Sequence, residues 1–133
     1  MTRTISLAPL TILELAPPDM VSCAAQAGYS HLGLRLHPVM PNLDLSYPIV
    51  GDTAMVREVL RRLDDTGLQV LDVEFVRLTP DVRIPDYVPM LETAARLSAK
   101  HVLAGGNDPD ERRLSERFAE LCDAALPLGL TIN

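Results

Sequence analysis

Short segments in which apolar and polar residues alternate, repeated along the chain, constrain the fold most. In the segment 31–37 the leucines occupy one face of an extended strand and Arg35 the other, and in 71–75 apolar residues alternate with carboxylates such as Glu74. Successive strand side chains point to opposite faces, so each strand has one apolar and one polar face. Strands of an open doubly wound parallel sheet are usually apolar on both faces. A polar second face therefore favours the inside of a barrel with a polar mouth.

A helical pattern follows each of the first four predicted strands, which indicates a parallel sheet covered by helices on one face. The predicted strands are 5–8, 31–36, 68–76, 101–104 and a fifth that begins at Leu130. Their starts recur about every 30 residues, the length of one strand–helix–strand unit. The connection 37–51 contains three prolines and is predicted to be irregular.

The helix boundaries follow from caps and breakers. The first helix is predicted to begin at Pro17 and to stop at Gly28. The next three are predicted to be capped by Asp52, Asp86 and Asp108. The last of them is expected to bury one stripe of residues at helical spacing. That stripe comprises Leu114, Phe118, Leu121, Cys122 and Ala125.

The length of 133 residues fits a single domain, 1–133, and the composition is that of an ordinary soluble protein. The net charge of −6 disfavours a nucleic-acid partner, because binding to a phosphate backbone needs a basic surface. No apolar run is long enough for a bilayer span and no signal peptide is visible, so we expect a cytoplasmic protein without a membrane partner. Cys23 and Cys122 are expected to be reduced thiols without a disulfide.

Four strand–helix units and one further strand amount to about half of an eight-unit barrel, which typically needs about 250 residues. We therefore interpret the chain as the truncated N-terminal half of an α/β (β/α)8 TIM barrel. Such a half leaves two open sheet edges, and we expect it to form homo-oligomers through them.

Three segments carry a family likeness: 28–35 (GYSHLGLR), 66–74 (TGLQVLDVE) and 124–133 (AALPLGLTIN). They resemble the xylose-isomerase-like TIM barrels, also described as the sugar phosphate isomerase/epimerase or AP-endonuclease-2 superfamily. The resemblance implies metal-dependent isomerisation or epimerisation of a small sugar, polyol or sugar phosphate. It also implies a divalent ion (Mn, Mg, Co or Zn) held by residues of strands five to eight. No metal ligand is then expected in this chain, and the chain alone is expected to be inactive.

Catalytic groups of parallel barrels lie at the carboxyl ends of strands and in the loops that follow. Glu74 meets this criterion and is the candidate catalytic acid/base or hydroxyl ligand. Arg35 on the neighbouring strand is the candidate to bind a substrate oxygen. The alternative is that Arg35 and Glu74 form a structural ion pair, and we predict that they lie within ion-pair distance in either case.

Three further residues are candidates for substrate binding. His37 projects at the mouth, Arg77 follows the third strand, and Asn107 lies in the Gly-Gly-Asn-Asp turn after the fourth. Each also has a plain structural interpretation, as a loop cap, a solvated arginine and a tight turn, respectively. His31 and His101 lie near strand starts, where a structural role is expected.

Two other classes of function remain open. One is a metal-dependent hydrolase of the endonuclease branch, which the acidic charge disfavours. The other is a non-catalytic half-barrel that self-associates. No Ser-His-Asp arrangement, CxxC pair or dinucleotide fingerprint is visible in the sequence.

Overall fold

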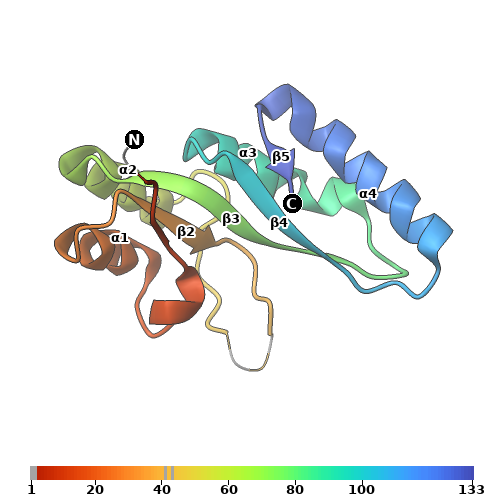
Figure 1. Cartoon of the computed structure of the whole chain (residues 1–133), viewed down its shortest axis with the longest axis horizontal. Coiled ribbons are helices and arrows are strands. Elements are labelled where there is room, and N and C mark those ends of the chain that lie inside the picture. Colours follow the sequence, from red (N-terminus) through yellow and green to blue (C-terminus); the bar gives the residue numbers. More distant parts are fainter. Residues whose placement is uncertain (1–2, 41, 43) are drawn as a thin grey trace.

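The computed structural model describes residues 3–40, 42 and 44–133. Five parallel strands form one sheet in the sequential order β1-β2-β3-β4-β5 (Figure 1). The strands are β1 (Ser6–Leu7), β2 (His31–Arg35), β3 (Gln69–Leu78), β4 (His101–Gly106) and β5 (Thr131–Ile132). The α-helices are α1 (Pro17–Gln26), α2 (Ala54–Thr66), α3 (Val88–Arg96) and α4 (Glu111–Ala125), and short 3-10 helices are η1 (Pro9–Ile12), η2 (Ile84–Tyr87) and η3 (Leu126–Leu128).

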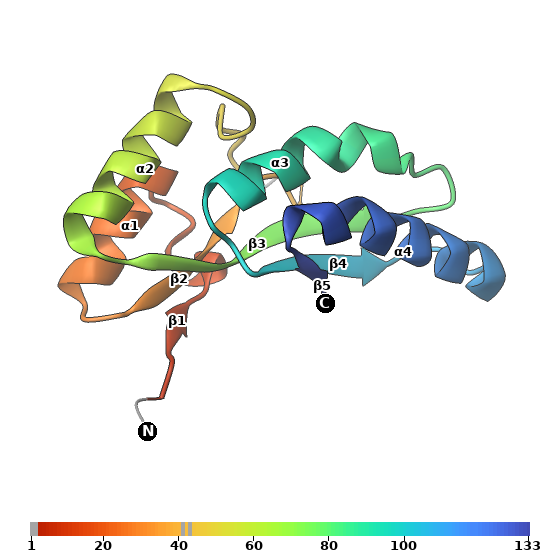
Figure 2. The same cartoon turned by 90° about the horizontal axis from the view of Figure 1, so that it is seen from above.

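The helices pack against one face of the sheet, as expected for strand–helix units; Figure 2 shows α1, α2 and α3 on that side. The core lies between this face and the helices. Its largest fully buried side chains are Val21, Leu32, Leu34, Ile49, Val56, Val59, Val73, Val76, Ile84, Met90, Leu91 and Leu121. We call the opposite face, which carries Arg35 and Glu74, the open face.

The strands differ in length from the prediction. The first is shorter, since Ile5 is 57% exposed and only Ser6 and Leu7 pair with β2. The third extends to Leu78 and the fourth to Gly106, because the two remain paired beyond the predicted ends. The described residues of the connection between β2 and α2 form no helix or strand, as predicted, and Pro41 lies outside the described residues.

The predicted ends of the helices at Gly28, Gly67 and Gly129 coincide with left-handed backbone, with φ of 83°, 71° and 70°, although α4 passes through η3 before Gly129. The predicted amino-terminal caps are wrong in three cases. Thr53 rather than Asp52 caps α2, and Asp110 rather than Asp108 caps α4.

Asp86 caps nothing, because it lies within η2, which leads directly into α3. Asp108 instead pairs with Arg113, at 2.6 Å, and accepts a hydrogen bond from the Asp110 amide. The predicted stripe of α4 is also only partly correct: Leu121 and Ala125 are buried, but Phe118 is 40% exposed.

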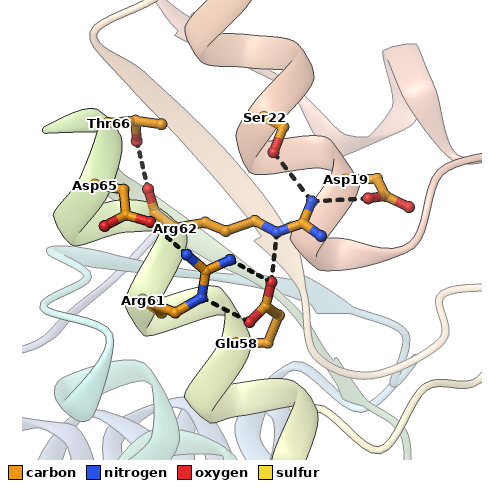
Figure 3. A network of polar contacts seen from close by, with 7 residues as sticks. All are labelled: Asp19, Ser22, Glu58, Arg61, Arg62, Asp65 and Thr66. Atoms are coloured by element: carbon orange, nitrogen blue, oxygen red, sulfur yellow. Dashed lines mark hydrogen bonds and ion pairs between the residues drawn. The ribbon is translucent and has the colours of Figure 1, made fainter.

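A network of polar contacts connects α1 to α2 on the surface (Figure 3). The Arg62 guanidinium donates to Asp19 Oδ1 and Ser22 Oγ of α1, at 2.8 and 3.0 Å, and to Glu58 Oε1 of its own helix, at 2.8 Å. Arg61 also donates to Glu58. Together, the hydrogen bonds from the two arginines lower the pKa of Glu58 to about 2. The network therefore joins the surfaces of the two helices and keeps Glu58 charged.

None of the helices in the described part of the chain combines the length and apolar character that a bilayer span requires. Cys23 and Cys122 are both free thiols and are half-buried.

Candidate functional site

An ion pair between neighbouring strands forms the centre of the candidate site. Arg35 and Glu74 are direct register partners on β2 and β3. Arg35 Nε and Nη2 lie 2.9 and 2.7 Å from Glu74 Oε2. The side chains are 11% and 12% exposed, so the pair is nearly buried. The prediction that these residues form an ion pair on the open face is confirmed.

Asp44 is a third member of this cluster that the sequence analysis missed. Its Oδ2 accepts hydrogen bonds from Arg35 Nη1, at 2.9 Å, and from the amides of Val39 and Met40, at 2.6 and 2.9 Å. Burial of the side chain raises its pKa, but the two amides and the arginine outweigh this effect and lower it overall. Asp44 lies in an irregular, proline-rich connection, where no periodic pattern could place it opposite Arg35.

Asp44 also borders a narrow cavity of about 40 Å³ between η1, α1 and the connection after β2. Its second carboxylate oxygen, Oδ1, is buried and has no hydrogen-bond partner among the residues that the structure describes. His37 and Tyr47 contribute to the same cavity.

Phe75 lies on the open face, which corrects the predicted alternation along the third strand. The register of β3 against β4 shifts between Glu74 and Val76, so Phe75 no longer shares a face with the buried Val73. The ring is placed over Gly105: a Cβ atom at Gly105 would lie 2.5 Å from Phe75 Cζ. Glycine is thus required there by the close approach of the ring.

Arg77 and Asn107, two predicted binding residues, are joined directly. Arg77 Nη1 donates to Asn107 Oδ1 at 3.0 Å, and Nη2 donates to the carbonyl oxygen of Val39 at 2.9 Å. The guanidinium carbon lies 5.4 Å from the centre of the Phe75 ring, within cation–π range. Arg77 therefore connects the ends of β2, β3 and β4.

His37 lies at the mouth, as predicted. Its ring packs edge-on against Tyr87, with 5.4 Å between ring centres, and burial lowers its pKa. Its backbone amide donates to the carbonyl oxygen of Glu74. His31 and His101 bond to Ser30 and Thr131, respectively, at strand starts. Those two contacts agree with the structural role predicted for them.

Asp72 is a further ionisable group of the open face, one layer below Glu74. Its Oδ1 would lie 2.4 Å from a Cβ atom at Gly33, so it occupies the space that this glycine leaves. Burial raises the pKa of Asp72, and the neighbouring His101 opposes that effect. The alternation in the sequence shows that Asp72 faces this way, but only the structure shows its burial.

The family resemblance implies a divalent metal ion, and its ligands would be carboxylate or imidazole groups. No group of three or more His, Cys, Asp or Glu side chains in the described part of the chain could hold a metal ion. Glu74 and Asp44 both face the same guanidinium, which already satisfies their charge. The described residues do not fit a divalent ion.

Comparisons with known proteins show that this chain has a familiar fold. No protein-family model and no curated protein matches the chain. Among solved structures, a sugar phosphate isomerase/epimerase from Parabacteroides distasonis is 18% identical, with a TM-score of 0.62 over 99% of this chain and 50% of that one.

The IolI protein, solved with a bound zinc atom, is 18% identical, with a TM-score of 0.68 over 98% of this chain and 50% of its own. D-Psicose 3-epimerase, solved with D-fructose, is 11% identical, with a TM-score of 0.69 over 98% and 51%. The chain thus spans about half the length of these proteins. With its sequential parallel sheet, it has the fold of half a xylose-isomerase-like TIM barrel.

Proposed function

We propose that the chain forms the substrate-binding wall of a barrel that isomerises or epimerises a small sugar, polyol or sugar phosphate. The observation that carries the proposal is the convergence of polar side chains at the carboxyl ends of β2, β3 and β4. This is the end of a parallel barrel at which active sites occur. The likeness in fold to a sugar phosphate isomerase/epimerase and to D-psicose 3-epimerase supports the same substrate class.

Glu74 is proposed either to accept a hydrogen bond from a substrate hydroxyl or to take up the proton of that hydroxyl. Both contacts from Arg35 go to Oε2, and no hydrogen bond joins Oε1 to a described residue. Oε1 is thus the oxygen available on the open face. The arginine fixes the orientation of the carboxylate, which favours a positioned acid or base over a mobile one.

Arg35, His37, Arg77 and Asn107 are proposed to line the same wall. A sugar presents many hydroxyl groups, which both donate and accept hydrogen bonds. The guanidinium groups and the Asn107 amide supply donors, and Glu74 supplies an acceptor. Because the described residues do not fit a metal ion, the role proposed for this chain is to bind and orient the substrate. The chain alone is expected to bind without turnover.

A titration tests this proposal. The 15N-labelled 133-residue chain is titrated with D-fructose and with D-psicose, and amide chemical shifts are followed by NMR. We expect saturable shifts confined to the ends of β2, β3 and β4, and weaker binding for Glu74→Gln. Glu58→Gln, which changes an equivalent charge on the surface of α2, is the matched control and should bind like the original. Shifts confined to the helix layer, or none at millimolar sugar, would contradict the proposal.

A second candidate function is self-association, and the sheet edges favour it. Among the described residues, β1 and β5 each have a neighbour on one side only. Unpaired strand edges present free amides and carbonyls to another chain. We propose that two copies of the chain pair through these strand edges, so that the open face of one copy lies opposite the open face of the other.

Light scattering coupled to size-exclusion chromatography measures the oligomeric state over a range of protein concentrations. Ile5→Lys, next to β1, is expected to shift the population toward the monomer, since lysine opposes pairing at an edge. Phe118→Lys, on the exposed part of α4, should leave it unchanged. A stable monomer at high concentration would refute the proposed pairing.

A further inference from the structure

Arg77 differs from the other arginine of the site in its charge balance. Arg35 contacts two carboxylates, those of Glu74 and Asp44. Arg77 forms no ion pair with any carboxylate of the described residues, and its two partners, Asn107 Oδ1 and the Val39 carbonyl, are neutral. Its positive charge is therefore not compensated by a direct contact. An arginine in this state at the mouth of a barrel favours an anionic ligand.

The guanidinium is also held in place before any ligand binds. The Phe75 ring lies against it, Asn107 and Val39 each accept one hydrogen bond, and Gly105 makes room for the ring. The side chain has five N–H donors, of which these bonds use two. No other hydrogen bond joins them to a described residue. A fixed fork with unused donors matches the geometry of phosphate or carboxylate oxygens.

We propose that Arg77 binds the anionic group of the substrate, and that the preferred ligand is therefore a phosphorylated sugar rather than a neutral one. This inference rests on the proposed function and specifies its substrate class. Arg77 positions the ligand and takes no part in bond making or breaking. Phe75 acts through Arg77, because it holds the guanidinium plane.

The charges around Arg77 determine the side from which the anion approaches. An outer groove beside Arg77 is also lined by His37, Asp81, Asp86 and Arg83. The two carboxylates would repel an anion within that groove. The phosphate is therefore expected on the open-face side of the guanidinium, where Phe75 and Asn107 lie. Removing Arg83 or the two carboxylates should consequently affect binding much less than removing Arg77.

The test compares D-fructose 6-phosphate, D-fructose and inorganic phosphate as ligands of the same chain, by NMR titration at low ionic strength. We expect the phosphorylated sugar to bind roughly tenfold tighter than D-fructose, as hydrogen bonds to a charged group predict. Inorganic phosphate should compete with it and shift the Arg77 side-chain signals. Arg77→Gln should abolish the preference, so that D-fructose 6-phosphate binds no more tightly than D-fructose does.

Two further variants distinguish the loss of a specific contact from misfolding of the chain. Arg77→Lys keeps the charge but loses the fork, and should retain only part of the preference. Arg83→Gln removes an equal charge from the outer groove and should retain all of it. Equal binding of both sugars by the original chain would overturn the inference and leave the proposed function intact, whereas binding of neither would overturn both. A preference that survives in Arg77→Gln, with native amide spectra, would also overturn the inference.

Discussion

Replacing Arg35 with methionine should destabilise the fold more than any other single change at the site. The guanidinium contacts the carboxylates of Glu74 and Asp44, whose side chains are only 12% and 2% exposed. Methionine fills a similar volume without a charge, so both carboxylates lose their cation in a nearly buried position. Breaking a buried pair by removing one partner costs about 3–5 kcal/mol. We expect a loss near the top of this range, because two anions are left together.

Glu74→Gln should cost far less, about 1–2 kcal/mol. The amide still accepts a hydrogen bond from Arg35, and the arginine keeps its contact with Asp44. Urea unfolding followed by circular dichroism at pH 7 measures both variants. With a slope of about 2 kcal/mol per molar urea, Arg35→Met should lower the midpoint by roughly 2 M and Glu74→Gln by less than roughly 1 M.

Arg57→Met is the matched control. Arg57 pairs with Asp52 at 2.9 Å, but the two side chains are 56% and 69% exposed, so water screens the pair and little change in midpoint is expected. If Arg35→Met shifts the midpoint no further than Arg57→Met does, the cluster does not contribute to stability in the way its burial implies. The reasoning would also fail if Glu74→Gln cost as much as Arg35→Met.

Three further outcomes are expected. Burial raises the folded-state pKa of Asp72, so protonation of this residue stabilises the fold. The stabilisation is complete below about pH 3.9 and is lost as the pH rises. Asp72→Asn should therefore raise the urea midpoint at pH 7 but not at pH 3. Gly105→Ala would place a Cβ atom 2.5 Å from Phe75 Cζ, so it should lower stability by about 1–3 kcal/mol and shift the ring's NMR signals. The pKa of Glu58 is lowered to about 2, so the ionised side chain stabilises the fold above about pH 4.3, and this stabilisation is lost as the pH falls toward 2. Glu58→Gln should lower the Tm at pH 7, and the difference in Tm between the variant and the original should shrink toward pH 2.

The central ion pair could be predicted because two local rules act together. Alternation assigned Arg35 and Glu74 to the same face, and the parallel order of sequential strands made them neighbours. Both rules depend only on backbone geometry, which a sequence pattern reports directly. Phe75 breaks the first rule, because the register shifts between Glu74 and Val76 and no residue type announces the shift.

The remaining errors concern segments whose conformation depends on tertiary contacts. Asp52, Asp86 and Asp108 are all good capping residues, but the chain turns into two of the helices one or two residues later, at Thr53 and Asp110. Asp108 is used instead by Arg113, which approaches from the first turn of α4. Asp44 was missed for a related reason: its side-chain partner, Arg35, lies on a strand, and its own segment has no periodic pattern.

The polarity of the open face limits what can lie against it. Across β2, β3, β4 and β5, one layer is Gly33, Asp72, His101 and Thr131 in register, and the layer above it begins with Arg35 and Glu74. Barrel interiors are usually filled by bulky branched side chains. The lower layer has none, and the layer above it has Leu103, the register partner of Glu74. An apolar surface placed here would desolvate the Asp72 carboxylate, which accepts no hydrogen bond from a described residue, at a high cost. Whatever covers this face must therefore bring donors and acceptors of its own, and a polyhydroxylated ligand near the mouth, with a polar protein surface below it, satisfies that requirement.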